Sequence, residues 1–205
     1  MIALDHAAVP AARELLNMVL AALSGDYVRG EGLVTRPDGI AVPIDRDDPM
    51  ATLCRLLAED LCLMQRRDGD GESVLTAAAL CFPAGWTLAQ KFLRQMIAIH
   101  APIARYDADL AARVQRLLDG VRPGRGLMRG AAHWCGSPLH HPLNEDEKFA
   151  SPGDTPNIRV ERQCLFRLPD TRAVMFSIHT SIVAPSALTP HQAETLAEFP
   201  IRRSA

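Results

Sequence analysis

Two neighbouring stretches of alternating hydrophobicity constrain the fold of this chain more than any other feature. Arg159–Leu168 and Val174–Val183 each alternate apolar and polar residues, and Pro169-Asp170-Thr171-Arg172 joins them as a turn. Because this period of two is typical of a strand with one buried face, we expect an antiparallel pair. The preferred register buries both apolar sets together, Val160, Cys164, Phe166 and Leu168 with Val174, Phe176, Ile178 and Ile182.

This register separates the arginines of the first strand. Arg162 falls on the apolar face, where its guanidinium needs a carboxylate partner or must reach solvent at the sheet edge. Arg159 and Arg167 fall on the opposite face, which we expect to be mostly polar and solvated.

The remaining segments predict a second hairpin and several helices. Leu61–Met64 and Val74–Phe82 flank a polar segment with two Asp-Gly pairs, which is typical of antiparallel strands. Residues 40–44 predict a short strand, and the polar residues 143–157 predict a long loop. Apolar spacing and capping residues predict helices over 10–23, 49–58, 88–99, 107–118 and from 190 onward. Asp48, Asp107 and Thr189 are the expected caps, and Thr87-x-x-Gln90 has the spacing of a capping box. In the helix over 107–118, we expect the apolar side chains to face inward, namely Leu110, Val114, Leu117 and Leu118.

These elements indicate one α+β domain over residues 1–205. We expect an antiparallel sheet of about five strands with helices packed on one face or end. The 22 basic and 24 acidic side chains give a net charge of −2, too balanced for a nucleic-acid-binding protein. The longest apolar run, Val74–Phe82, is far shorter than a bilayer span, so we expect neither a membrane segment nor a signal peptide.

The cysteines and histidines narrow the chemistry further. The 5 cysteines include no Cys-x-x-Cys pair, which predicts reduced thiols in the cytoplasm and excludes zinc ribbons and covalent haem attachment. The spacing of His133, Cys135, His140 and His141 does not match the usual structural-zinc patterns. The chain also lacks a G-x-S-x-G elbow, a Walker-type loop and a G-x-G-x-x-G motif, so it has no dinucleotide site of its own.

Four segments stand out beyond these patterns. They read Cys81-Phe82-Pro83-Ala84-Gly85-Trp86, then Ile99-His100-Ala101-Pro102-Ile103-Ala104-Arg105-Tyr106, then Arg129 to Trp134, then Arg159-Val160-Glu161-Arg162-Gln163 leading to Leu168-Pro169. In this order, from about Asp60 to Val183, they resemble the family of haem-dependent oxidative N-demethylases. The last segment is the most specific of the four.

The resemblance implies a PAS-like fold that binds non-covalent haem b. In catalytic members, O₂ and electrons from a separate reductase remove a methyl group from a small secondary amine. This chain departs from the family at Ile103-Ala104-Arg105, where the family favours Val-Pro-Gly, and at Ala132-His133-Trp134, where the family favours an asparagine before the tryptophan. Three alternatives therefore stay open: an N-demethylase, a haem sensor or carrier without turnover, and a degenerate member that acts as an interaction subunit, each compatible with a homodimer.

Two residues carry the expected haem contacts. His100 is our candidate for the iron ligand, since a neutral imidazole at a constrained helix end can hold one ring orientation. The alternative is a helix-end histidine that hydrogen-bonds its own last turn. Arg162 could pair with a haem propionate, or with a carboxylate from a neighbouring element.

Four further side chains complete the set. Tyr106 could supply a proton or steer an amine, and His179 could be a distal group or proton donor, although a strand histidine more often faces solvent. Trp86 and Trp134 could line a porphyrin pocket, although core packing explains each ring equally well.

Overall fold

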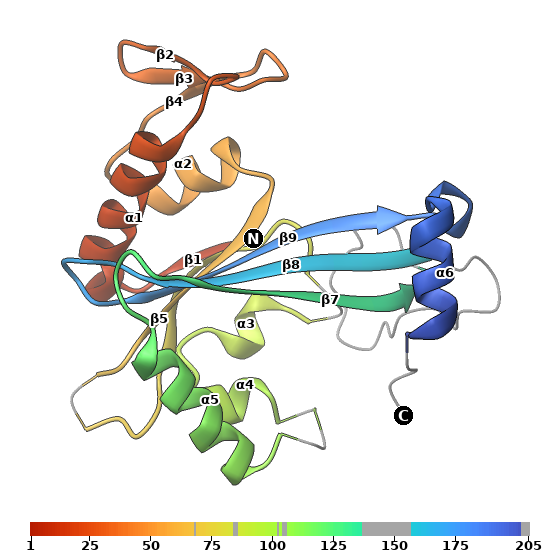
Figure 1. Ribbon diagram of the computed structural model, residues 1–205. Helices are drawn as coiled ribbons and strands as arrows, with labels where there is room; N and C mark the ends of the chain where they lie inside the picture. The colour runs from red at the N-terminus through yellow and green to blue at the C-terminus, as the bar shows by residue number, and fades with distance from the viewer. Residues whose placement is uncertain (68, 84–85, 102, 104–105, 137–156, 202–205) are drawn as a thin grey trace.

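An antiparallel sheet of six strands forms the centre of the structure (Figure 1). The structure is a computed structural model that describes residues 1–67, 69–83, 86–101, 103, 106–136 and 157–201. The strands lie in the order β1-β6-β5-β9-β8-β7, and every neighbouring pair is antiparallel. Their bounds are β1 Ile2–Leu4, β5 Glu59–Gln65, β6 Val74–Ala79, β7 Leu127–Cys135, β8 Asn157–Arg167 and β9 Val174–Val183.

Helices α1 (Val9–Ala22) and α2 (Pro49–Leu56) cover one face of the sheet, called the first face below (Figure 1). α1 buries its apolar stripe there, because leucines at helical spacing come to one side of a helix. The core of this face includes Leu15, Leu16, Leu53, Leu61 and Leu63. A small sheet of three strands lies beyond the end of α1, with β2 Val28–Gly30, β3 Leu33–Thr35 and β4 Ala41–Pro43, and the short helix η1 (His6–Ala8) precedes α1.

Helices α3 (Leu88–Lys91), α4 (Met96–Ile99) and α5 (Ala108–Gly120) cover the opposite face, called the second face. Leu88 and Leu118 pack there against Cys62, Met64, Leu75 and Val174 of the sheet. Gln115 fixes α5 to the loop before β6, because its Oε1 accepts from Ser73 N at 2.7 Å and its Nε2 donates to Ser73 Oγ at 3.1 Å.

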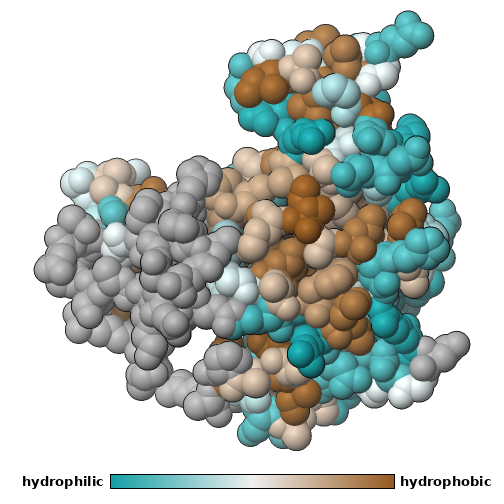
Figure 2. Space-filling model, turned by 180° about the vertical axis from the view of Figure 1, so that it is seen from behind, coloured by the Kyte–Doolittle hydropathy of each residue, from teal (hydrophilic) through white to brown (hydrophobic). Residues whose placement is uncertain are grey.

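The chain ends with η2 (Pro185–Ala187) and α6 (Pro190–Glu198) beside the far ends of β7, β8 and β9 (Figure 1). Hydrophobic side chains also reach the surface, and Figure 2 shows a group of them in the middle of the rear side, bordered by hydrophilic ones. No helix among the described residues is long and apolar enough to cross a membrane.

Local sequence signals predicted many of these elements correctly. The hairpins β5–β6 and β8–β9, helix α1 and strand β4 are confirmed. The predicted caps are also confirmed: Asp48 accepts from Ala51 N and Asp107 from Leu110 N, while Thr189 and Gln192 form a capping box. Most of the predicted loop, residues 143–156, lies outside the described residues.

The prediction of one helix over residues 88–99 was wrong. The segment forms the two short helices α3 and α4, and the Thr87 side chain makes no capping hydrogen bond. Between them, Leu93 adopts a left-handed φ of 60°, and the backbone of Leu93 and Arg94 pairs with Leu75. Pairing with β6 therefore replaces the helical hydrogen bonds of this segment.

Three other expectations need correction. The sheet has six strands rather than about five, and helices cover both faces rather than one. Leu117 of α5 points outward, with 49% of its surface exposed. Strands β1, β2, β3 and β7 were not predicted.

The predicted register of β8 and β9 was wrong by one residue. Leu165 pairs with Phe176 and Arg162 with His179. Leu165 packs on the second face and Phe166 on the first, so strand alternation places the even-numbered residues of β8 on the first face. Arg159 and Glu161 thereby come to the second face, where both are buried rather than solvated.

Candidate functional site

A buried ion pair on the second face links two of the four segments singled out above. Arg159 Nε donates to Glu161 Oε1 at 2.7 Å, and both side chains are less than a tenth exposed. The other end of the guanidinium donates to the Phe82 carbonyl at 2.5 Å and to Thr180 Oγ1 at 3.1 Å. The segment that begins at Arg159 thus holds the loop that contains Phe82.

This network continues across the sheet toward β7. Gln163 Nε2 donates to the second carboxylate oxygen of Glu161 at 2.7 Å, and Arg129 Nε donates to Gln163 Oε1 at 2.7 Å. Alternation along β8 explains the order, because residues 159, 161 and 163 share one face. A buried pair of this kind tolerates its lost hydration only when further hydrogen bonds are made, and here Arg159 Nε and Nη2 and both carboxylate oxygens of Glu161 have partners.

Asp60 of β5 binds the backbone of the same loop. Its Oδ1 accepts hydrogen bonds from Cys81 N at 2.5 Å and from Phe82 N at 2.9 Å. Burial raises the pKa of this carboxyl, while the two backbone amides and the charge of Arg159 oppose that rise. Asp60 and Arg159 together therefore fix the backbone of residues 81–82.

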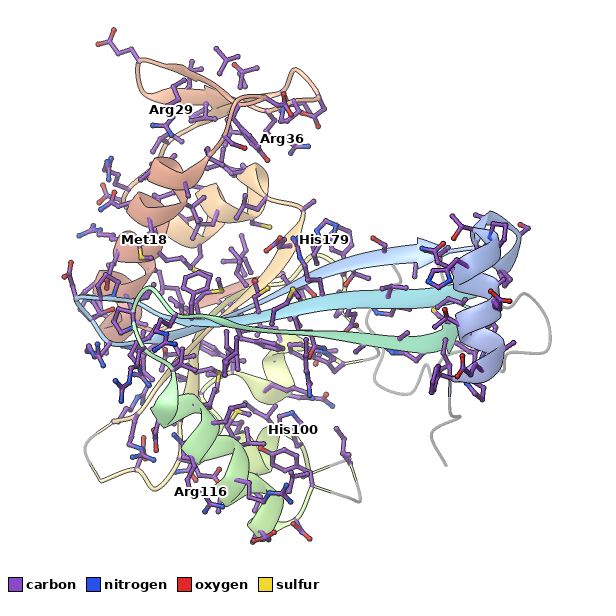
Figure 3. All side chains as sticks on the ribbon, in the orientation of Figure 1. Met18, Arg29, Arg36, His100, Arg116 and His179 are labelled. Carbon is purple, nitrogen blue, oxygen red and sulfur yellow. The ribbon has the colours of Figure 1, made fainter. Side chains whose placement is uncertain are left out.

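His100 lies at the C-terminal end of α4 in the layer over the second face (Figure 3). Its Nδ1 is 2.9 Å from the Met96 carbonyl, and its ring stacks on Tyr106 with centroids 4.2 Å apart and planes inclined by 18°. Burial is the main cause that lowers the pKa of this histidine, and the positive charges of Lys91 and Arg129 lower it further. The hydrogen bond to the Met96 carbonyl and the charge of Glu72 oppose this shift without reversing it. The ring is thus held neutral.

The hydrogen bond to Met96 decides which nitrogen of His100 carries the proton. A carbonyl accepts only, so Nδ1 must be the N–H and Nε2 keeps its lone pair. Nδ1 thus makes the bond to its own last helical turn that the sequence analysis gave as the alternative to iron ligation. Metal-ligating histidines commonly donate their other ring N–H to a carbonyl in the same way.

The hydroxyl of Tyr106 is a second polar group in the layer that contains His100. Its hydroxyl oxygen is buried and has no hydrogen-bond partner among the described residues. Burial raises the pKa of the phenol, so it stays protonated at neutral pH. An unsatisfied buried hydroxyl costs free energy unless something else binds it, so Tyr106 is available to a ligand.

The two tryptophans lie on different faces. Trp86 packs in the second-face core, with Lys91 Nζ 4.9 Å above its ring. The same ammonium donates to the Ile99 carbonyl at 3.0 Å, which ties Trp86 to the helix that ends at His100. Trp134 pairs with Ile158, an even-numbered residue of β8, and therefore shares the first face with it.

Arg162 and His179 also lie on the first face, away from His100. Arg162 Nη2 is 3.0 Å and His179 Nδ1 3.8 Å from the same oxygen of Glu59. Figure 3 shows His179 above the sheet and His100 below it. The structure thus brings His100, Tyr106 and Trp86 to one layer and leaves Arg162, His179 and Trp134 on the other face.

The sequence interpretation ranked Arg159 below Arg162 as a haem-contacting arginine because it expected a solvated face, and it missed Glu161 and Asp60 as members of the site. One signal could have found Arg159 and Glu161: alternate charged residues of opposite sign in Arg159-Val160-Glu161 fall on one strand face and can pair there. His133 pairs with Arg159 across β7 and β8, and burial lowers the pKa of its ring. His140 and His141 lie outside the described residues. Among the described residues, no group of three or more histidine, cysteine, aspartate or glutamate side chains could hold a metal ion.

A pocket elsewhere does not belong to this arrangement. It is lined by Arg13, Leu16, Asn17, Arg46 and Asp47, beside α1 on the first-face side. Its polar groups already bond one another, since Arg13 Nη2 donates to Asp47 Oδ1 at 2.8 Å and Arg46 donates to Asn17.

Comparison with known proteins agrees with the four segments. The family model described as haem-dependent oxidative N-demethylase, alpha subunit-like matches residues 1–199. This match extends well beyond the region from Asp60 to Val183 where the motifs lie. A search of curated proteins found no match. The chain therefore belongs to the haem-dependent oxidative N-demethylase alpha subunit-like family.

Proposed function

We propose that this protein binds haem b non-covalently and that His100 would hold the iron. The observation that carries the proposal is the neutral His100 ring, with Nδ1 bonded to the Met96 carbonyl and Nε2 left as a lone-pair donor. Second-sphere bonds of this kind orient histidine ligands and strengthen them. Membership of the family supports the identity of the metal group.

We also propose that strands β5 to β9 and their helices form a PAS-like domain. These five strands lie in the sheet in the order β6-β5-β9-β8-β7, and α3, α4 and α5 connect the second strand to the third. A sheet of this size with helices on it is what the resemblance implied. Strand β1 and the first-face helices are additions to it.

The chemistry we propose is the oxidative removal of a methyl group from a small secondary amine. Bound haem would supply O₂ activation and the electrons would come from a separate reductase, since the chain has no dinucleotide motif. Tyr106 would donate its hydroxyl hydrogen to a ligand beside His100, because that hydroxyl is buried and protonated. Trp86 would supply apolar contact from the same layer.

Arg162 and His179 have no part in this proposal. Both meet Glu59 on the first face, so the pairing of Arg162 with a propionate and the role of His179 as a distal group or proton donor stay predictions from the sequence. On the second face, Lys91 and Arg129 are cations whose charges act on His100.

Expression with supplemented haem tests the proposal. We expect the purified wild type to show a Soret band, and His100→Ala to lose it or shift it strongly. His191→Ala is the matched control, since His191 is an exposed histidine of α6 and its loss should leave the spectrum unchanged. A colourless wild type, or identical spectra for wild type and His100→Ala, would remove the proposal and favour an interaction subunit.

A haem sensor or carrier without turnover is the second candidate. The observation in its favour is that Arg162 and His179 lie on the face opposite His100, which leaves fewer polar groups for catalysis on the second face. Formaldehyde release from dimethylamine-like substrates, measured with an added reductase, separates the two. Formaldehyde production that depends on His100 supports the enzyme hypothesis. A Soret band without formaldehyde production supports a haem sensor or carrier.

A further inference from the structure

Two cysteine thiols from different elements lie in contact on the first-face side of the molecule. Cys54 belongs to α2 and Cys81 to the loop after β6, and their Sγ atoms are 3.4 Å apart although 27 positions separate them. Both residues are partly exposed, whereas Cys62 and Cys135 are buried. Reagents in solution can therefore reach this pair.

The contact makes the two sulfurs chemically unequal. A hydrogen bond from the Cys81 thiol is the main cause that lowers the pKa of Cys54, to about 6, and the charges of the Met1 ammonium and Arg55 act in the same direction. Burial and the charge of Asp60 oppose this effect. The same contact raises the pKa of Cys81, so that its sulfur keeps the proton. Cys54 is thus the nucleophile, because thiolates and not thiols attack disulfides.

We propose that Cys54 and Cys81 form a reversible disulfide by exchange with a low-molecular-weight disulfide such as glutathione disulfide. The Cys54 thiolate attacks one glutathione sulfur, and the S–S bond of that molecule breaks and releases one glutathione thiolate. Cys81 then loses its proton to solvent, attacks the Cys54 sulfur of the mixed disulfide and expels the second glutathione thiolate. The protein thiols lose two electrons, and glutathione disulfide gains them and becomes two glutathione molecules.

Little movement is needed for this bond. The sulfurs must approach by roughly 1.4 Å to reach a bond length of about 2.05 Å. The bond would tie α2 to the loop in which Asp60 accepts from Cys81 N and Phe82 N. Oxidation would thereby clamp the backbone that carries the Phe82 carbonyl bound by Arg159.

Peptide mapping of the full chain tests the proposal without reference to haem. The wild type is equilibrated with glutathione disulfide, its free thiols are trapped with N-ethylmaleimide, and it is digested with trypsin. Cleavage after arginine and lysine places Cys54 in residues 47–55, Cys62 in 56–66 and Cys81 in 68–91. We expect the peptides 47–55 and 68–91 to be linked, and to separate again after excess reduced glutathione.

Variants define the order of attack. Cys81→Ser should accumulate glutathione on Cys54, because no second thiol is present to expel it. Cys54→Ser should react with glutathione disulfide at least tenfold more slowly at the remaining Cys81 at pH 7. Cys164→Ser is the control: it removes a half-buried thiol of β8 and should leave the link intact.

Two results would overturn the proposal. One is recovery of both peptides with separately alkylated cysteines after oxidation. The other, which needs no variant, is a wild-type Cys54 that alkylates at pH 7 no faster than Cys164. A formed link should also raise the midpoint of thermal unfolding by about 5–10 °C, because a disulfide restricts the unfolded chain.

Discussion

Arg159 and Arg162 belong to the same strand, yet their side chains meet opposite environments. Arg159 is 3% exposed and bonded to Glu161, whereas Arg162 is 58% exposed and reaches Glu59 at the surface. We expect Arg159→Met to lower the free energy of unfolding by about 3–5 kcal/mol, because the buried Glu161 loses its cation. Arg162→Met should change it by less than about 0.5 kcal/mol. Urea denaturation of both variants measures the difference, and equal losses would contradict the assigned faces.

The buried His100 ring predicts a dependence of stability on pH. Burial lowers the pKa of His100 in the folded protein, so between that pKa and the ordinary value of about 6.5 the unfolded chain binds more protons. Stability from this ring is therefore present above pH 6.5 and is lost as the pH falls below it, by at most about 1.4 kcal/mol per pH unit. Urea denaturation of the haem-free protein at pH 7 and pH 5.5 measures the loss.

The variant His100→Phe isolates this effect from other groups that titrate in the same range, Cys54 among them. Phenylalanine preserves a ring against Tyr106 but has no proton to bind. We expect a smaller loss between the two pH values than in the wild type. His191→Phe is the control, and a wild-type loss no larger than that of His100→Phe would contradict a buried neutral imidazole.

At the level of the secondary-structure element, α5 depends on its first residues. Asp107 Oδ1 accepts from Leu110 N at 2.9 Å, so Asp107→Ala should cost about 1 kcal/mol of stability. Asp109→Ala, in the same first turn, removes a charge but no cap and should cost a few tenths of a kcal/mol. Amide hydrogen exchange at Leu110 supplies a second readout, because only the first variant frees that N–H. Equal exchange in both variants would contradict the cap.

The elements that could be predicted from the sequence are those that short-range chemistry determines. Asp48, Asp107 and Thr189 cap their helices with their own side chains, so the helix starts can be read locally. The break at Leu93 could not, because its backbone partner, Leu75, comes from another element. Tertiary pairing there outweighs helix propensity.

The prediction of the register between β8 and β9 was wrong for a related reason. Alternation showed correctly which residues of each strand share a face, but the prediction took the charged face of β8 to be the solvated one. Arg159 and Glu161 are buried because they satisfy each other and the Phe82 carbonyl, a group 77 positions from Arg159 in the sequence. His100 was singled out from its motif, and its role as an iron ligand stays a prediction, whereas the network around Arg159 could be recognised only from the fold.

At the scale of the whole molecule, the sheet separates two cores that hold different groups. Leu15 of α1 belongs to the first-face core, and Leu88 of α3 belongs to the second-face core. His100, Tyr106 and the Arg159 network lie on the second-face side, while Cys54, Arg162 and His179 lie on the first. Truncating a buried leucine on either side should therefore affect global stability similarly, but only one truncation should reach His100.

We expect Leu15→Ala and Leu88→Ala each to lower the free energy of unfolding by about 2–5 kcal/mol, the range for a leucine removed from a core. Leu88→Ala also loosens α3, whose Lys91 donates to the Ile99 carbonyl next to His100. Water then gains access to the His100 ring, and its pKa should rise toward 6.5, as seen in the NMR titration of the imidazole. Leu15→Ala should leave that titration at its wild-type midpoint. Because the sheet is the only layer between the two cores in the described part of the chain, a shift in both variants would mean that the sheet transmits strain between its faces.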